Sequence, residues 1–405
     1  MKQKIHFRAI EGDSPAYYGL IILLGTMILS ALGATWFMEH NGHWVTGMNN
    51  QIAWGLPHVF AVFLIVAASG ALNIASIGSV FGKKEYKPLA PLSGLLAICL
   101  LIGGLTVLVL DLGRPDRLIV AMTTYNFKSI FAWNIILYNG FLVVVGAYLW
   151  TMMDKSMAKY NKIAGFSAFA WRLTLTTGTG SIFGFLVARQ GYDAAIMAPM
   201  FIVMSFAYGK AIFLLVLMTS SHYTGRPLGD AMISRIKNLM GIFVAAALFF
   251  VVTFHLTNLY ATEHHGYEAF ILRDGGIYTQ LFWIGQVLIG GLIPLAILFH
   301  PCLGKSRPMI ATASVMIILG GLVQMYVTII GGQAFPLVLF PGMEVSSSFF
   351  DGVINSYSPS LPEFILGIGG IAVAMIAVAL AVKILDFLPE DLSDEVADPQ
   401  HVVID

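Results

Sequence analysis

Long apolar stretches separated by short polar segments dominate the pattern of this chain. Each stretch reaches the length of about 20 residues that an α-helix needs to cross the hydrocarbon core of a membrane. We expect a helix in each of ten stretches, which cover roughly residues 16–36, 54–81, 90–111, 130–152, 164–189, 195–218, 240–260, 278–299, 308–332 and 363–387. The pattern therefore predicts an all-α integral membrane protein with ten transmembrane helices.

Composition supports this class and argues against several others. Of the 405 residues, 58% are hydrophobic and only 11% are charged, whereas about a quarter of a soluble domain is charged. The net charge is zero, so we do not expect nucleic acid as a partner. The two cysteines, Cys99 and Cys302, are too few to ligate an iron–sulfur cluster, which needs about four ligands, and we expect no metal site.

The distribution of Lys and Arg predicts the orientation. These residues are concentrated in the loops of one face, and the other face holds only Arg114, Arg117, Lys128, Arg189 and Arg273. By the positive-inside rule, we expect a multi-pass protein of the cytoplasmic (inner) membrane with both termini in the cytoplasm. The long loops at 37–53, 261–277 and 333–362 then lie outside.

The chain accordingly divides into three parts. We expect a cytoplasmic N-terminus (1–15), a membrane domain (16–387) and an acidic cytoplasmic tail (388–405). The tail region is rich in Asp and Glu and lacks Lys and Arg, so we expect it to be solvated.

The run Leu-Asp-Leu-Gly-Arg-Pro-Asp-Arg at 110–117 places four charges at the outer end of the third stretch. Charges at membrane depth are costly and mark functional sites. Asp111 still lies within the interface, so its carboxylate is able to accept a proton. Arg114, Asp116 and Arg117 follow in a turn, and we expect them to form the lip of a site or to contact a partner. The alternative is a helix stop with internally satisfied ion pairs.

Three further polar residues are expected at the same depth. His58 lies about one turn inside the second stretch, directly after a proline that leaves a backbone carbonyl free. Asn134 and Tyr138 are four residues apart, so they share one face at the outer end of the fourth stretch. These residues indicate a ligand or proton site near Asp111. For His58 the alternative is a buried histidine bonded to a neighbouring helix.

His255 and Asn258 end the seventh stretch, also on the outer side. With His58, His255 would supply the two axial ligands of a haem b. We do not expect this haem, because cytochrome b subunits of this size usually carry more than one such pair. We therefore interpret His255 and Asn258 only as polar residues of the second half.

The fifth stretch is unusually polar for a membrane span, and Arg172, Thr176 and Thr179 share one face of it. Lys210 in the sixth stretch lies at nearly the same depth. A lone charge at the centre of the membrane costs about 2.5–3.5 kcal/mol, so two of them indicate a hydrated proton path. The alternative is that both side chains snorkel to the cytoplasmic interface.

The run at 110–117, together with Trp-Gly-Leu-Pro-His at 54–58 and the ten-helix layout, resembles the NrfD/PsrC family of membrane subunits of polysulfide reductase and related complexes. Residues 42–48 and 57–63 are most similar to the DsrP group of that family, which belongs to the DsrMKJOP complex of dissimilatory sulfur metabolism. The resemblance implies two four-helix bundles, formed by helices 2–5 (about 54–189) and 6–9 (about 195–332), with helices 1 and 10 at the periphery.

The resemblance also implies a function. Family members carry no haem or iron–sulfur cluster of their own and bind an exchangeable quinone (menaquinone or ubiquinone) near the outer face, and His58 matches the histidine of that site. The expected role is a quinone-reactive anchor that exchanges electrons with a periplasmic ferredoxin-like iron–sulfur subunit (DsrO-like). The other implied partners are a haem b membrane subunit (DsrM-like), a cytochrome c subunit (DsrJ-like) and a cytoplasmic iron–sulfur subunit (DsrK-like). Proton translocation, a secondary transporter or channel, and a purely structural anchor remain open alternatives.

Overall fold

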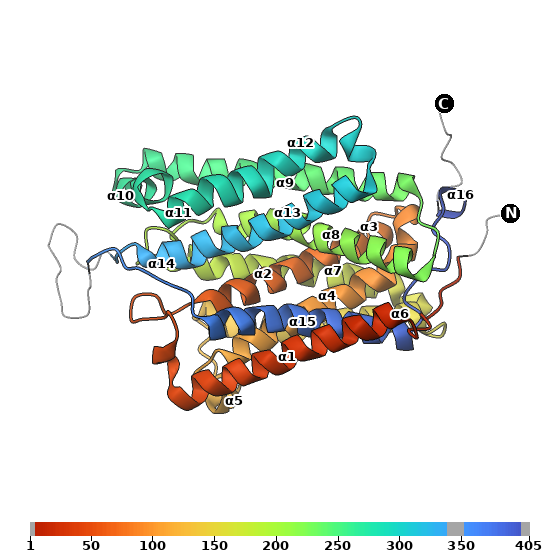
Figure 1. The fold of residues 1–405 in the computed structure, drawn as a ribbon, viewed down its shortest axis with the longest axis horizontal. Coiled ribbons are helices and arrows are strands. Elements are labelled where there is room, and N and C mark those ends of the chain that lie inside the picture. Colours follow the sequence, from red (N-terminus) through yellow and green to blue (C-terminus); the bar gives the residue numbers. More distant parts are fainter. Residues whose placement is uncertain (1–4, 338–351, 398–405) are drawn as a thin grey trace.

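The structure is a computed structural model that describes residues 5–337 and 352–397. Long helices running side by side make up most of these residues (Figure 1). The only β-type contacts among the described residues are two isolated bridges, Phe7 with Pro389 and Leu228 with Leu392. The predicted all-α membrane class is therefore confirmed.

Nine helices of the described residues are long and apolar enough to cross a membrane. They are α1 (Pro15–Asn41), α2 (Leu56–Ala71) continued by α3 (Asn73–Ser79), η2 (Lys84–Leu89) continued by α4 (Ala90–Leu110), α6 (Ile130–Met153), α8 (Met197–Thr224), α9 (Asp230–Tyr260), α11 (Ile277–Gln280) continued by η7 (Leu281–Leu292) and α12 (Ile293–Phe299), α13 (Arg307–Tyr326) continued by η9 (Val327–Gly331) and α14 (Gly332–Ala334), and α15 (Leu361–Ile384).

The tenth predicted span corresponds to α7 (Asn161–Gly184), which has 24 residues and packs against α6 and α8. Its length suits a span, but it is not among the nine helices that meet the apolar criterion. The polar stripe that begins at Arg172 explains the difference, because it lowers the mean hydropathy of this helix. The structure thus places a helix in each predicted stretch without confirming ten spans.

The packing of the helices groups them into two halves. In the first, α2 packs on α4 and α6 packs on α7; in the second, α8 packs on α9 and α13 packs on η7. The first and last long helices, α1 and α15, pack against each other, and α15 also packs on α4. The halves meet where α2 crosses α8, at Gly70 and Gly209. A Cβ at Gly70 would lie 1.6 Å from the Ser205 carbonyl oxygen, so only glycine permits this approach.

The two ends of the molecule differ. Segments near the chain termini come together at one end, where the Arg8 amide donates to the Leu388 carbonyl at 3.0 Å. We call this the terminal end. Residues 42–55, the short helix α5 (Leu118–Thr123) and α10 (His265–Ala269) lie at the opposite end, which we call the loop end (Figure 1).

Two predicted loop or tail segments are more structured than expected. Leu388 and Leu392 are buried, and Asp394 accepts a hydrogen bond from the Ala231 amide, so residues 388–397 pack on the helices instead of being solvated. Their apolar side chains outweigh the acidic composition of the segment. Residues 398–405 of the predicted tail lie outside the described residues. The predicted outer loop at 261–277 is also helical for most of its length.

Candidate functional site

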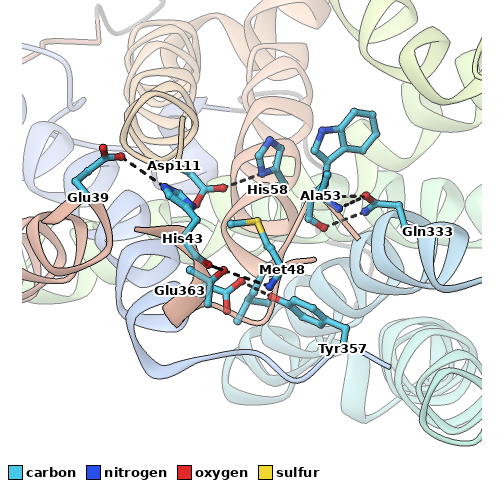
Figure 2. Close-up of polar contacts among 12 residues, drawn as sticks. Glu39, His43, Met48, Ala53, His58, Asp111, Gln333, Tyr357 and Glu363 are labelled. Carbon is cyan, nitrogen blue, oxygen red and sulfur yellow. Dashed lines mark hydrogen bonds and ion pairs between the residues drawn. The ribbon is translucent and has the colours of Figure 1, made fainter. Parts of the chain in front are cut away.

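His58 and Asp111 meet at the loop end of the first half. His58 lies in the first turn of α2, where Pro57 is tolerated because the first amides of a helix have no helical partner. Asp111 caps the end of α4, which packs against α2. The beginning of one helix thus lies beside the end of the other, and His58 Nδ1 is 2.9 Å from Asp111 Oδ2 (Figure 2). At this distance the two groups are able to share a proton.

The Asp111 carboxylate is buried yet incompletely satisfied. None of its side chain is exposed, and its Oδ1 atom has no hydrogen-bond partner among the described residues. An unsatisfied buried carboxylate oxygen is costly, and such atoms are rare in proteins. This acceptor is therefore suited to a donor that arrives with a ligand.

A hollow of about 360 Å³ lies over Asp111. Its size falls in the range of about 300–1,000 Å³ that is typical of small-molecule sites. The hollow opens to the loop end, and its lining combines aromatic, sulfur and polar groups: His43, Trp44, Met48, Asn49, Ala53, Asp111, Leu112 and Gly113. It has room for one aromatic ring in contact with a carboxylate.

Helix α15 holds the segment that lines the hollow. The buried Glu363 carboxylate accepts hydrogen bonds from the Gly47 amide at 2.8 Å and from the Tyr357 hydroxyl at 2.6 Å (Figure 2). The Tyr357 hydroxyl in turn accepts from the Leu56 amide at 2.6 Å. Both ends of residues 47–56 are therefore anchored by one buried acid.

The end of α14 holds the same segment from the second half. Gln333 Oε1 accepts from the amides of Ala53 and Trp54, each at 3.0 Å, and Gln333 Nε2 donates to the Trp54 carbonyl at 3.0 Å. The Trp54 indole is stacked beside the His58 imidazole, with ring centroids 6.1 Å apart. Arg189 adds hydrogen bonds to the carbonyls of Gln51 and Gln333. Gln333 thus fixes the ring that borders His58.

The other charges of the 110–117 run separate from Asp111, as the sequence predicts. Arg114 and Asp116 form an exposed ion pair at 3.1 Å, and the guanidinium holds the pKa of Asp116 below its usual value. Arg117 is also exposed. None of these three side chains lines the hollow. The positive φ of Gly113, +55°, permits the sharp turn that carries the chain away from Asp111.

Asn134 and Tyr138 are not brought to the hollow. Both are buried, and Asn134 Nδ2 donates to the Gly178 carbonyl of α7 at 3.0 Å. Thr179 Oγ1 lies 3.5 Å from Asn134 Oδ1. In the structure these two side chains face α7, and their predicted contact with a ligand gains no geometric support.

A second histidine–carboxylate pair lies at the loop end of the second half. His255 Nδ1 is 2.7 Å from Glu268 Oε2, and Asn258 Nδ2 donates to Glu268 Oε1 at 2.9 Å. Glu268 is fully buried. Sequence reasoning misses it, because the pattern of residues 261–277 predicts an outer loop. The apolar neighbours of Glu268, from Tyr267 to Leu272, are the signal that this segment is packed.

Arg172 and Lys210 are fully buried where the two halves meet. Arg172 Nη2 donates to Asn73 Oδ1 at 2.8 Å, and Thr176 Oγ1 donates to Ser69 Oγ at 2.5 Å. Phe206 lies between the two cations, 4.9 Å from Arg172 Cζ and 5.0 Å from Lys210 Nζ. Neither head group reaches the surface, so the snorkelling alternative does not describe this structure.

Comparison with known proteins follows the same division. The family described as "Polysulphide reductase, NrfD" matches residues 44–337. An "Hdr-like menaquinol oxidoreductase integral membrane subunit" of Archaeoglobus fulgidus is 28% identical over 397 residues, which cover 97% of this chain and 99% of that protein.

Two more distant relatives also match along most of their length. A protein of Mesobacillus selenatarsenatis that is named as one of the subunits of selenate reductase is 23% identical, with 84% of this chain and 87% of that protein covered. A "Menaquinone reductase, integral membrane subunit" of Nitratidesulfovibrio vulgaris is 22% identical, with 86% of each chain covered. Because the family match spans more than half of the chain, this multi-pass membrane protein belongs to the polysulphide reductase NrfD family.

Proposed function

We propose that this chain is the quinone-interacting membrane subunit of a multi-subunit oxidoreductase complex, and that the quinone head group binds in the hollow over Asp111. The observation that carries the proposal is the free Oδ1 atom of a buried carboxylate that is paired with His58 and faces a ring-sized hollow. Two relatives are named as menaquinol or menaquinone oxidoreductase subunits, which supports this ligand class and favours menaquinone over ubiquinone.

The chemistry of the pair suits this role. Oxidation of a quinol releases two protons and two electrons. Asp111 Oδ1 accepts the hydrogen bond of a quinol hydroxyl, and the Asp111–His58 pair takes the proton as a general base. The imidazole spreads the charge that arises, since Asp111 stabilises its protonated form at 2.9 Å. This chain offers no electron acceptor of its own in the proposal, so the electrons pass to a partner.

The partner docks at the loop end, where the hollow opens. Arg114, Asp116 and Arg117 are exposed beside the hollow and provide polar contacts for a neighbouring subunit. Together with the resemblance to DsrP, this supports a periplasmic ferredoxin-like iron–sulfur subunit as the electron partner. The same resemblance supports a complex of dissimilatory sulfur metabolism in the inner membrane, with haem b, cytochrome c and cytoplasmic iron–sulfur subunits and with both termini of this chain in the cytoplasm.

A proton path through the membrane is a second candidate function. Arg172 and Lys210 are buried on either side of the Phe206 ring, and Arg172 Nε and Nη1 have no hydrogen-bond partner among the described residues. Unsatisfied donors at this depth favour water beside them. If the path operates, Arg172→Gln lowers proton translocation per electron without loss of assembly. Unchanged coupling would reject it.

The quinone proposal is tested with Asp111→Asn and His58→Gln in membranes that contain the assembled complex. Loss of a general base usually costs on the order of a hundredfold or more, and we expect quinol-linked electron transfer to fall by that amount in both variants. Asp116→Asn, which removes an exposed carboxylate five residues away, is the matched control and keeps the wild-type rate. Wild-type turnover in Asp111→Asn would contradict the proposal, as would purification of the chain without any redox subunit.

A further inference from the structure

The Glu268–His255 pair has no role in the proposed quinone chemistry, although it is the better satisfied of the two pairs. Both carboxylate oxygens of Glu268 are occupied, one by His255 at 2.7 Å and the other by Asn258 at 2.9 Å. The carboxylate is fully buried. Two neutral arrangements of the pair, with the proton on Glu268 or on His255, are therefore held within one hydrogen bond.

The space beside this pair excludes a quinone. The cavity that His255 lines has a volume of about 20 Å³. A single water needs at least about 10–15 Å³ of such space, whereas small-molecule sites begin near about 300 Å³. The cavity therefore accepts water but not an aromatic ring.

Polar side chains continue from this cavity into the interior of the second half. Gln286 and Gln324 line it together with His255, and both also line a second cavity of about 20 Å³ deeper between the helices. Gln324 Oε1 accepts a hydrogen bond from the buried Tyr208 hydroxyl at 2.5 Å. Two water-sized spaces joined by amide groups are the elements of a proton-conducting chain.

The helices around these cavities have irregular hydrogen bonding. Gln286 lies in the π-helical segment η7, and Thr328, which also lines the first cavity, lies in the π-helical segment η9. A third π-helical segment, η6 (Phe270–Asp274), directly follows α10, which carries Glu268. Such segments are rare and frequently occur at functional sites. Among the described residues, all of them lie in the second half.

The groups that face the pair are known for each packed element. His255 and Asn258 belong to α9, and the Tyr267 phenol of α10 lies in the same electrostatic environment as Glu268. The phenol of Tyr192 lies next to Tyr267. The remaining neighbours of the cavity from η7, α13 and η9 are apolar side chains, amides and a hydroxyl. His255 is thus the strongest base beside Glu268.

From these observations we propose that Glu268 and His255 form a proton-exchange site that binds water and protons but no quinone, and that this site is the loop-end terminus of a proton path through Gln286, Gln324 and Tyr208. The site takes up or releases one proton through the water-sized cavity while His255 and Asn258 hold the carboxylate. The inference does not depend on quinone binding at Asp111.

Infrared difference spectroscopy of the purified full-length protein tests the proposal directly. A pH step in wild-type protein is expected to change the carbonyl-stretch band of a protonated carboxylic acid, and labelling with carboxyl-¹³C glutamate shifts this band. Glu268→Gln, which keeps the size and polarity of the side chain, abolishes it. Glu263→Gln is the matched control, since this glutamate of the same segment is 79% exposed, and it leaves the band in place. A wild-type spectrum in Glu268→Gln overturns the proposal.

His255→Gln provides a second test if Glu268→Gln does not fold. An opposite charge within about 4–6 Å shifts a carboxyl pKa by about 1–3 units, so loss of the imidazole displaces the titration midpoint of the glutamate band by at least about one pH unit. An unchanged midpoint contradicts the proposal. Quinol-linked electron transfer with an uncoupler present remains within about twofold of wild type in Glu268→Gln but is lost in Asp111→Asn. The two sites therefore succeed or fail separately.

Discussion

The two halves of this protein carry the same pair of groups in opposite settings. His58 Nδ1 lies 2.9 Å from Asp111, and His255 Nδ1 lies 2.7 Å from Glu268. Both carboxylates are buried at the loop end. Asp111, however, keeps one oxygen without a partner under a hollow of about 360 Å³, whereas Glu268 has both oxygens occupied beside a cavity of about 20 Å³. The surroundings of the pair, and not the pair itself, decide what each is able to bind.

The segment that covers each pair explains the difference. In the first half, residues 42–55 are held away from Asp111 by Glu363, Tyr357 and Gln333, so a hollow remains. In the second half, α10 folds back on α9 and inserts Glu268 itself, together with Tyr267. An anchored loop thus produces an open site, and a packed helix produces a closed one.

The largest expected effect concerns stability. His255→Leu leaves a buried Glu268 carboxylate without its basic partner, and breaking a buried pair costs about 3–5 kcal/mol. We expect this variant to unfold at a markedly lower temperature, measured by thermal denaturation in detergent. His58→Leu loses less, because Asp111 faces an open hollow that admits water. Equal losses in the two variants would remove the distinction between an open and a closed site.

Filling the hollow should block quinone binding without touching the pair. Met48→Trp adds volume at its lining, and we expect KM for the quinol to rise at least about tenfold, equivalent to about 1.4 kcal/mol of binding. Val143→Trp is the control, because Val143 is 70% exposed on the outer surface of α6. A normal KM in Met48→Trp would show that the ligand binds elsewhere.

A smaller effect is expected at Gln333, which fixes Trp54 beside His58. Gln333→Leu removes three hydrogen bonds, each worth about 0.5–1.5 kcal/mol. We expect kcat/KM for quinol oxidation to fall by about tenfold because the imidazole is less well oriented. Gln280→Leu, at an exposed position of α11, is the control. Steady-state kinetics that do not distinguish the two variants would reject the positioning role.

The smallest effect is expected at the exposed Arg114–Asp116 pair. Arg114 lowers the folded-state pKa of Asp116, so any stabilisation is present above the ordinary value of 3.8 and is lost as the pH falls through the lowered value. Solvent screens such a pair. Asp116→Asn is therefore expected to leave the unfolding temperature unchanged at pH 7. A measurable drop would assign this loop a structural role.

Local sequence patterns predict the helices and the first pair, since apolar length defines a span and since His58 and Asp111 lie at adjacent helix ends. They do not reveal Glu363, Gln333 or Glu268. Glu363 bonds to Gly47 and Gln333 to Ala53, across 316 and 280 residues, so only the packing of distant helices creates these contacts. Glu268 escapes prediction because a polar segment at a membrane edge resembles a loop until its fold is known.

Photolabelling with a quinone analogue that carries an azide on its ring tests the central claim most directly. The labelled peptides are mapped by mass spectrometry after illumination of the assembled complex, with natural quinol as competitor. We predict labels within residues 42–55 and 111–113, which natural quinol removes and Asp111→Asn weakens. Competable labels in residues 251–286, around the closed pair of the second half, would contradict the account.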